Sequence, residues 1–270
     1  MSQGFGVDVG GSGIKGAPVD LATGRLLAER VRVETPQPAT PEAVVELVGQ
    51  VLADPSFGQP DGRFGLTLPS VVVEGTALTA ANIDPAWVGT DVAGLVRERT
   101  GRDAFVVNDA DAAGLAEVRF GAAQGVRGTV LVLTLGTGIG SALFLDGQLV
   151  PNTELGHLEL DGHEAEKRAS DAARKKHDLS WRKWAKRVSA YVEHVDLLLR
   201  PDLVVLGGGV SKKSEQWLHL LDVRPPVRPA GLLNDAGIVG AAVLAAERPE
   251  NPAGQSGAPA SAISNHTVLP

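Results

Sequence analysis

Runs of apolar residues, some alternating and some continuous, predict β-strands in both halves of the chain. In the first half these strands are expected at 4–9, 14–20, 25–34, 64–68, 71–80 and 104–108. In the second half they are expected at 129–135, 138–145 and 203–206. Apolar residues at helical spacing predict helices near 42–52, 91–100, 110–122 and 235–246. This mixture of strands and helices indicates an α/β protein.

The clearest helical pattern lies in the middle of the second half. Apolar side chains recur there at spacings of four, three, four and three, at Trp184, Val188, Tyr191, Val195 and Leu198. Basic side chains lie between these positions and are expected on the opposite side of the helix. Pro201 is expected to end it, because proline cannot continue a helix.

The two halves of the chain repeat one arrangement. Residues 10–20 and 136–146 have the same spacing, each running from a glycine-rich turn through a strand to an aspartate at the next turn. Such a duplication predicts two similar domains facing a shared cleft. We assign 1–109, with a C-terminal helix at about 235–248, to a small domain and 110–234 to a large domain. Residues 249–270, rich in Pro, Ala, Ser and Gly, are expected to be a disordered tail.

Composition narrows the classes of protein. The chain has no cysteine, which excludes disulfides and thiolate metal sites and fits a cytoplasmic location. No segment approaches the roughly 18 consecutive apolar residues of a membrane span, and the first residues do not resemble a secretory signal. The formal charge of −7 argues against a nucleic-acid partner.

The charge is distributed unevenly along the chain. Residues 167–187 contain nine basic and two acidic side chains, a net +7, which leaves −14 for the rest of a chain whose total is −7. A solvated helix face and an anion-binding surface both account for such a stretch. The sequence leaves these two interpretations open.

A glycine-rich turn follows the first strand. Gly10, Gly11 and Gly13 would let backbone amides approach phosphate oxygens closely. Gly11, Gly13 and Gly16 also satisfy the glycine pattern of dinucleotide-binding folds. That interpretation needs a helix directly after the turn, and a strand is predicted instead, so we reject it. A hairpin without a ligand remains the alternative, although the matching second turn favours phosphate binding.

Two carboxylates at strand ends are candidates for chemistry. Asp8 lies at the end of an apolar strand, where a charge needs a partner, and would hold a Mg²⁺-bound water beside a phosphate. A salt bridge to Lys15 is its alternative. Asp109 follows the strand that ends at Asn108, a position suited to a general base. Its alternative is a helix N-cap, for which aspartate is a favoured residue.

An acid and a histidine follow the second glycine turn. Glu154 and His157 could hydrogen-bond neighbouring hydroxyl groups of a sugar. A metal site is the competing interpretation, since ligand types are plentiful at His157, Glu159, Asp161, His163 and Glu164. Their spacing matches no recurrent metal motif, which argues against it.

These motifs occur in an order that resembles the ROK family of repressors, open reading frames and sugar kinases. The segments that carry the resemblance are 8–16 (DVGGSGIKG), 108–110 (NDA), 135–140 (LGTGIG), 154–157 (ELGH) and 206–211 (LGGGVS). The match spans roughly residues 4–248. Within the family, the chain is most similar to the polyphosphate glucokinases and glucomannokinases. It implies the duplicated actin-like ATPase (ribonuclease H-like) fold and a cytoplasmic hexokinase-type enzyme for glucose or mannose.

The resemblance also implies residue roles. Asp109 would be the catalytic base for the sugar 6-hydroxyl, and Asp8 would serve Mg²⁺. The sugar hydroxyls would be held by Ser70, Asn82, Asn108, Asp109, Glu154, His157 and Glu166. Donor phosphates would be cradled by Gly10, Gly11, Ser12, Gly13, Lys15, Gly136, Thr137 and Gly138. Adenosine would lie against Gly207, Gly208 and Gly209 when ATP is the donor.

The chain departs from the family at one point. Many members carry a zinc-binding cysteine cluster after the Gly-His pair, whereas residues 163–170 here (HEAEKRAS) contain no cysteine. No zinc is therefore expected. The basic stretch that follows favours polyphosphate as a donor, because a long polyanion needs an extended basic track.

Two rival functions stay open beside the glucokinase. One is an ATP-only kinase for another hexose, and the other is a catalytically silent sugar sensor or regulator. The regulator is disfavoured, because the first predicted strand leaves no space for an N-terminal helix-turn-helix. A homodimer is compatible with the resemblance, and no nucleic acid or membrane partner is expected.

Overall fold

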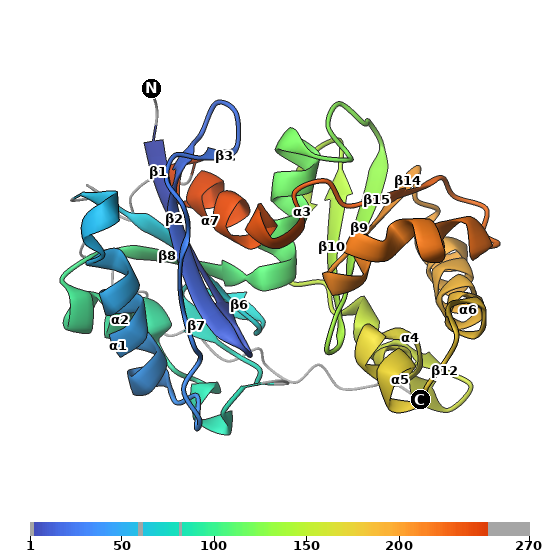
Figure 1. Cartoon of the computed structure of the whole chain (residues 1–270), viewed down its shortest axis with the longest axis horizontal. Coiled ribbons are helices and arrows are strands. Elements are labelled where there is room, and N and C mark those ends of the chain that lie inside the picture. Colours follow the sequence, from blue (N-terminus) through green and yellow to red (C-terminus); the bar gives the residue numbers. More distant parts are fainter. Residues whose placement is uncertain (1–2, 59–61, 81–82, 248–270) are drawn as a thin grey trace, which may run out of the picture.

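Two β-sheets lie side by side in the computed structural model, which describes residues 3–58, 62–80 and 83–247 (Figure 1). The first sheet contains β1 (Gln3–Gly10), β2 (Gly13–Asp20), β3 (Arg25–Leu26), β4 (Val31–Val33), β5 (Phe64–Leu68) and β8 (Ala104–Asn108). The second contains β9 (Thr129–Leu135), β10 (Ile139–Leu145), β11 (Gln148–Val150), β14 (Leu203–Gly207) and β15 (Val227–Pro229). Two short hairpins lie outside them, β6 (Val72–Val73) with β7 (Thr76–Ala77) and β12 (Glu159–Leu160) with β13 (His163–Glu164).

The two sheets have the same topology. Their strand orders are β3-β2-β1-β5-β8 and β11-β10-β9-β14-β15. In each sheet three antiparallel strands form a meander, and two further strands continue the sheet in parallel beside the central strand of that order, β1 or β9. The repeated spacing at 10–20 and 136–146 corresponds to the hairpins β1–β2 and β9–β10. The structure therefore confirms the predicted internal duplication.

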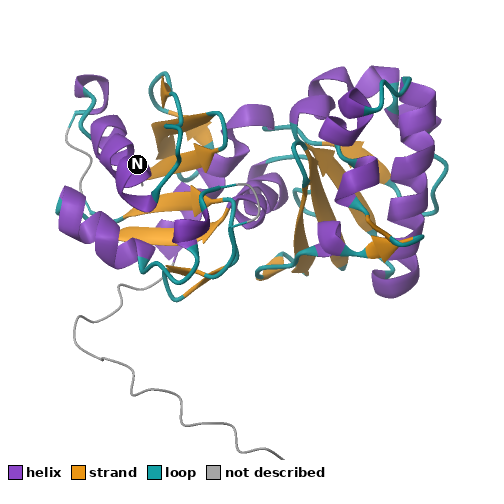
Figure 2. Ribbon diagram, turned by 90° about the horizontal axis from the view of Figure 1, so that it is seen from below, coloured by secondary structure: helices purple, strands orange, loops and turns teal. Residues whose placement is uncertain are grey.

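Helices fill the space between the sheets and cover their outer faces (Figure 2). Their bounds are α1 (Pro41–Leu52), α2 (Val92–Thr100), α3 (Asp109–Phe120), α4 (Glu166–Ala169), α5 (Asp171–Lys176), α6 (Trp181–Leu199) and α7 (Ala236–Glu247). Short 3₁₀ turns are η1 (Pro55–Phe57), η2 (Pro85–Trp87), η3 (Leu155–His157), η4 (Gly209–Gln216), η5 (Leu218–Leu220) and η6 (Leu233–Asp235). Helices α3 and α7 pack on each other in the centre, α7 against β1 and α3 against β10.

Glycine permits the closest of these contacts. A Cβ atom at Gly6 of β1 would lie 1.9 Å from the carbonyl oxygen of Ile238 in α7. A Cβ atom at Gly240 of α7 would lie 1.7 Å from the carbonyl oxygen of Ala112 in α3. Both separations are far inside van der Waals contact, so only glycine lets α7 join the first sheet to α3.

Two predicted strands are broken in the structure. The predicted strand 25–34 is wrong as one element: Val19 pairs with Leu26 but Ile14 pairs with Val33, so the register shifts and β3 and β4 contact β2 separately. The predicted strand 71–80 is wrong for another reason. Glu74 and Gly75 have φ values of 50° and 80°, and this left-handed turn folds the segment into the hairpin β6–β7.

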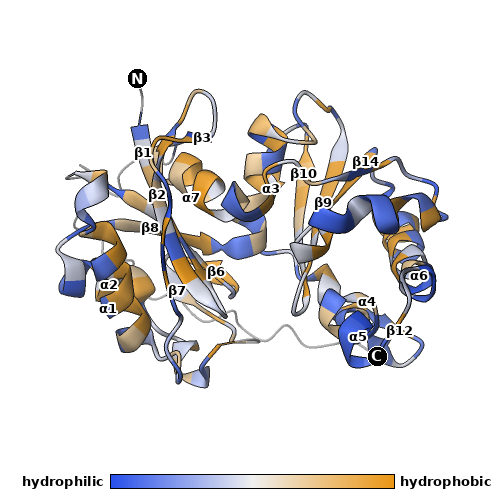
Figure 3. Cartoon of the chain, viewed as in Figure 1, coloured by the Kyte–Doolittle hydropathy of each residue, from blue (hydrophilic) through white to orange (hydrophobic). Residues whose placement is uncertain are grey.

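The amphipathic pattern at 184–198 is confirmed as part of α6. Its apolar positions through Val195 are buried, but Leu198 is 58% exposed, so the predicted stripe extends one residue too far. Arg200, with φ 49°, caps the helix in the left-handed conformation before Pro201. Colouring by hydropathy shows the apolar centre of both sheets and the hydrophilic α5 (Figure 3). No helix in the described ranges has the length and apolar character that a bilayer span requires.

Candidate active site

The junction of β8 and α3 presents the candidate base. The Oδ1 of Asn108 accepts hydrogen bonds from the backbone amides of Ala110 (2.8 Å) and Asp111 (3.1 Å), so Asn108 is the N-cap of α3. The alternative that Asp109 serves as the cap is therefore wrong. Asp109 is the first residue of the helix, and its Oδ1 accepts the Ala110 amide at 2.8 Å.

The environment of Asp109 makes its carboxyl group unusually basic. Burial is the main cause that raises its pKa to about 7, followed by the negative charge of Asp8. Glu154 and Asp111 add smaller contributions, and the hydrogen bond from Ala110 opposes them. A carboxylate whose pKa lies near neutrality is suited to accept a proton from a hydroxyl group.

Asp8 is held by the neighbouring strands. Its Oδ1 accepts a hydrogen bond of 2.8 Å from the Thr67 hydroxyl of β5, and its Oδ2 lies 3.3 Å from the Nζ of Lys15 on β2. The ion pair with Lys15, one of the two interpretations of Asp8, is thus present. The Asp8 side chain keeps 16% exposure, and its carboxylate supplies oxygen, the donor type that Mg²⁺ prefers. Asp8 therefore fits the metal that the family resemblance implies.

The first glycine turn is a tight hairpin. Gly10 pairs with Gly13 across it, and strand β2 follows directly, which confirms the rejection of a dinucleotide-binding turn. Gly11 and Ser12 at the tip are exposed. No sequence motif indicated Arg32, whose Nη2 donates to the Ser12 carbonyl at 2.6 Å and places a cation beside the turn.

The second glycine turn contacts two other segments. The Gly136 amide donates to the Gly138 carbonyl at 3.0 Å, and the Gly136 carbonyl accepts the amide of Ala172 in α5 at 3.0 Å. Thr137 at the tip is exposed. A Cβ atom on Gly208 would lie 2.6 Å from the Leu135 carbonyl oxygen, so the turn at Gly207, Gly208 and Gly209 packs against the strand that leads into the second glycine turn.

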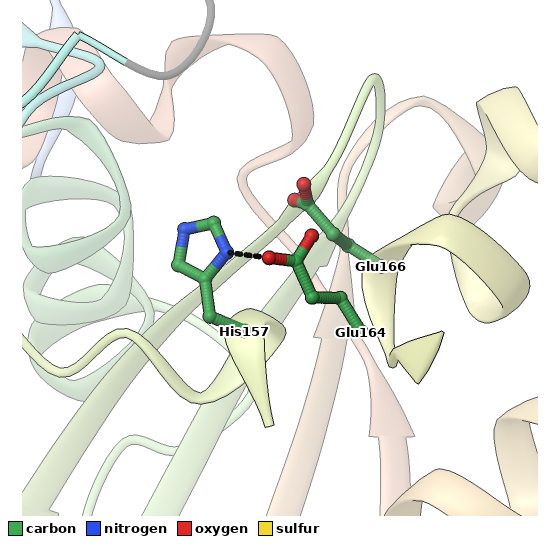
Figure 4. A group of neighbouring side chains, drawn as sticks. All are labelled: His157, Glu164 and Glu166. Atoms are coloured by element: carbon green, nitrogen blue, oxygen red, sulfur yellow. Dashed lines mark ion pairs between the residues drawn. The ribbon is translucent and has the colours of Figure 1, made fainter. Parts of the chain in front are cut away.

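A histidine and three acids gather beyond this turn. His157 lies 3.7 Å from Glu154 and 3.8 Å from Glu164, and the His157–Glu164 pair is drawn in Figure 4. The ligand atoms of His157, Glu164 and Glu166 all lie within 4.8 Å of one another. Of the alternative metal set, only His157 and Glu164 belong to this group, and Lys167 already neutralises Glu164 at 2.6 Å. The arrangement suits hydrogen bonding to hydroxyl groups better than binding of a cation.

Glu154 and Glu166 tie this cluster to the rest of the site. The Nδ2 of Asn108 lies 3.5 Å from the Oε1 of Glu154, whose pKa is raised, chiefly by burial. The Ile139 amide donates to the Oε2 of Glu166 at 3.3 Å, beside the second glycine turn. Asn108, Glu154, His157 and Glu166 therefore lie together, as the resemblance implies.

The remaining predicted sugar residues differ from these. Ser70 is only 2% exposed, and its hydroxyl lies within hydrogen-bond distance of the carbonyls of Val71 and Thr79. Its own carbonyl accepts the Nδ2 of Asn108 at 3.1 Å, so Ser70 positions Asn108. Asn82 lies outside the described residues, as does the predicted tail at 249–270.

Asp111 is a further acid that the motifs did not indicate. Its Oδ2 accepts the Asn152 amide at 2.7 Å, while its Oδ1 is buried without a partner among the described residues. Burial raises its pKa to about 7, opposed by the Asn152 hydrogen bond. An acid in the first turn of a helix is common on protein surfaces, so its residue type alone did not signal this burial. Here Asp111 anchors the chain that follows β11.

Comparisons with known proteins agree with this geometry. A polyphosphate glucokinase of Mycobacterium tuberculosis is 50% identical over 242 residues, covering 89% of this chain and 90% of that protein. The crystal structure of inorganic polyphosphate/ATP-glucomannokinase from Arthrobacter sp. strain KM matches with a TM-score of 0.87 at 51% identity, covering 91% of this chain and 99% of that one.

A more distant structure extends the comparison. A ROK glucokinase from Streptomyces griseus, solved with glucose and AMPPNP, matches with a TM-score of 0.79 at 27% identity over 92% of this chain and 100% of that one. The duplicated sheets are those of the actin-like ATPase fold of these sugar kinases. The ROK family profile matches residues 4–176. Together with the half-identical relatives, this match shows that the chain belongs to the ROK family.

Proposed function

We propose that this protein is a hexokinase-type kinase that transfers a phosphoryl group to the 6-hydroxyl of glucose from inorganic polyphosphate or ATP. The observation that carries the proposal is the state of Asp109. Asn108 caps α3, so the Asp109 carboxyl group is not needed as the cap, and its pKa is raised to about 7. The identities of 50% and 51% to a polyphosphate glucokinase and a glucomannokinase support both donor and sugar, with mannose as a second sugar.

The sugar would lie beside Asp109. Asn108, Glu154, His157 and Glu166 supply amide, carboxylate and imidazole groups that can hydrogen-bond adjacent hydroxyls. In this arrangement Asp109 accepts the proton of the sugar 6-hydroxyl while the hydroxyl oxygen attacks the phosphoryl group. Ser70 acts through its contact with Asn108, and Asn82 remains a predicted sugar ligand.

The donor would lie between the two glycine turns. Backbone amides at Gly10–Gly13 and Gly136–Gly138 would face the phosphates, with Lys15 and Arg32 beside the first turn. With ATP as donor, the turn at Gly207–Gly209 would receive the adenosine. Mg²⁺, when bound at Asp8, would neutralise negative charge on the transferred group.

The basic stretch offers a path for a longer donor. The amide of Ala172 binds the Gly136 carbonyl, so α5 starts at the second glycine turn. Lys175 and Lys176 extend from α5 as exposed cations, although Lys175 also pairs with Asp171 at 2.7 Å. A cationic helix that begins at the phosphate-binding turn is where the phosphates beyond the transferred one would run.

We also infer the domain division predicted from the duplication, 1–109 with the C-terminal helix against 110–234. Asn152 connects the two parts: its Oδ1 accepts the Val72 amide at 3.0 Å and its Nδ2 donates to the Val72 carbonyl at 2.9 Å. Closure of the two parts would exclude water, a competing acceptor for the phosphoryl group. A cytoplasmic location, a homodimer, and the absence of zinc and of a nucleic-acid partner stay predictions.

The test is direct. Purified protein is mixed with glucose and Mg²⁺, and glucose 6-phosphate is measured with polyphosphate and with ATP in separate reactions. Product from either donor in the wild type, and a rate at least ~10²-fold lower in Asp109→Asn, is the expected result. Full turnover in Asp109→Asn would remove the base from the proposal, and no product from either donor would favour the sensor alternative. Product from ATP alone would leave the basic stretch as a solvated surface.

A further inference from the structure

A cavity of about 190 Å³ is lined by residues of α4 and α6 within the basic stretch, and by none of the side chains of the acidic cluster His157, Glu164 and Glu166. Its wall is partly apolar, formed by Leu160, Ala165, Ala169 and Ala190. The volume is several times the ~30 Å³ that one water molecule occupies, which leaves room for a tetrahedral oxyanion. None of the motifs that define the proposed kinase site lines this cavity.

Three cations line the cavity: Arg168 of α4, and Lys186 and Arg187 of α6. Asp161 is the one acid among the lining residues, and it lies 3.5 Å from the Nη1 of Arg168. Within the described part of the chain, no carboxylate lies at ion-pair distance from Lys186 or Arg187. The lining therefore carries a net positive charge beside apolar side chains, with Lys186 and Ala190 at its exposed edge.

The cavity also contains an unpaired donor. Tyr191 of α6 is fully buried, and its hydroxyl has no hydrogen-bond partner among the described residues. Burial raises the pKa of this phenol well above its usual value, so it stays protonated and can donate. A buried hydroxyl without a partner is unfavourable, and Tyr191 is one of the residues that line the cationic cavity.

We propose that this cavity is a second phosphate-binding site, separate from the glycine turns, in which Lys186, Arg187 and the Tyr191 hydroxyl donate to phosphate oxygens. These three groups donate and, in their protonated forms, match a ligand that offers acceptors only. The Arg187 Nη1 already donates to the Arg168 carbonyl at 3.4 Å, which orients its guanidinium toward α4.

Two sources can supply such a phosphate. One is a distal part of the polyphosphate donor, which rests on the proposed function. The other is a separate phosphorylated small molecule. Helix α4 favours a link with the active site, because Glu166 contacts the second glycine turn and Arg168, two residues later, lines the cavity on another face of the helix.

Binding tests the site without requiring turnover. Tripolyphosphate and inorganic phosphate are titrated calorimetrically into the wild type, Tyr191→Phe, Lys186→Ala/Arg187→Ala and the control Arg127→Ala, an exposed cation of the same half of the chain. Wild type and control should bind tripolyphosphate at one more site than the double variant, and Tyr191→Phe should weaken that site several-fold. Equal stoichiometry and affinity in all four proteins would overturn the proposal. Tyr191→Phe removes one oxygen only, so it remains informative if the double variant fails to fold.

Kinetics then identifies the source. If the cavity takes distal donor phosphates, the ratio of kcat/KM for long polyphosphate to that for ATP should fall at least tenfold in Lys186→Ala/Arg187→Ala. If the cavity takes a separate phosphorylated molecule, that ratio of kcat/KM values should be the same in the double variant as in the wild type. The titration of the double variant with inorganic phosphate should then show one binding site fewer. Absence of glucose 6-phosphate in the wild type would contradict the proposed function and leave the binding result standing.

Discussion

The carboxylate of Asp8 and the carboxyl group of Asp109 lie close enough for the charge of the first to raise the pKa of the second. Asp8 lies near the end of β1 in the first sheet, and Asp109 begins α3, the helix that packs against the second sheet. The duplicated fold thus places the proposed base next to the carboxylate proposed to serve Mg²⁺. This relationship sets how activity should depend on pH.

We expect kcat/KM for glucose to fall as pH decreases through about 7, because Asp109 with a pKa near that value loses its ability to accept a proton. Asp8→Asn removes the charge that helps raise the pKa of Asp109. The acidic limb in the pH profile of that variant's residual activity should therefore shift to lower pH. The measurement is a pH–rate profile for both proteins at saturating Mg²⁺. An unshifted acidic limb in Asp8→Asn would contradict the electrostatic coupling of the two residues.

Asp109→Asn should lower kcat by at least ~10²-fold, the usual contribution of a general base, while glucose affinity changes little. The amide keeps the shape of the side chain and can still accept the Ala110 hydrogen bond. Turnover and glucose binding are measured separately, by product formation and by calorimetry. Loss of glucose binding in parallel with turnover would assign Asp109 to positioning the sugar instead of catalysis.

Asp111 should make the fold less stable as pH rises. Its folded pKa of about 7 is raised above the ordinary carboxyl value, so the folded state holds a proton that the unfolded chain has released between about pH 4 and 7. Stability from this group is therefore complete at low pH and is lost as pH increases through 7. Asp111→Asn should be more stable than wild type at pH 8 by about 2 kcal/mol and show little gain at pH 4.

Denaturant unfolding at these two pH values measures the difference. Asn can still accept the Asn152 amide through its carbonyl oxygen, so the variant preserves the contact that Asp111 makes. A variant that is equally destabilised at both pH values would show that the carboxylate is needed for packing, whatever its charge.

The duplication was the part of the fold that sequence reasoning predicted best, because two glycine turns at equal distances from an aspartate indicate a repeated hairpin. Helices α4 and α5 were not predicted, since four and six residues are too short for a periodic pattern. The broken strand at 25–34 depends on a register shift that residue types do not encode.

The residues of the candidate active site, too, could be predicted from the sequence only in part. Asn108 and Asp109 are both favourable caps, so only the backbone geometry could decide which one is left for chemistry. Arg32 reaches the first glycine turn from β4, twenty residues further along the chain, and no local motif signals such a contact.

Asn152 should contribute to stability through two distinct effects. It makes both hydrogen bonds to the backbone of Val72, and its φ of 58° is a conformation that asparagine tolerates better than alanine does. Asn152→Gly removes the side-chain hydrogen bonds, at a cost of about 1–3 kcal/mol, and adds the greater entropy of glycine in the unfolded chain. Asn152→Ala should cost a further ~1 kcal/mol of backbone strain. Unfolding of the two variants separates these effects, and equal stabilities would show that the left-handed backbone carries no cost here.

Charge reversal on α5 should distinguish the two donors. Lys175→Glu/Lys176→Glu places two negative charges on a helix that begins at the second glycine turn, where a polyphosphate chain would run and where ATP needs no contact. We expect the ratio of kcat/KM for polyphosphate to that for ATP to fall at least tenfold, and the fall to be smaller at high salt, which screens exposed charges. Arg127→Glu reverses an exposed charge away from α5 and should leave the ratio close to that of the wild type. A similar fall in both variants would mean that overall charge, and not a path along α5, governs the use of polyphosphate.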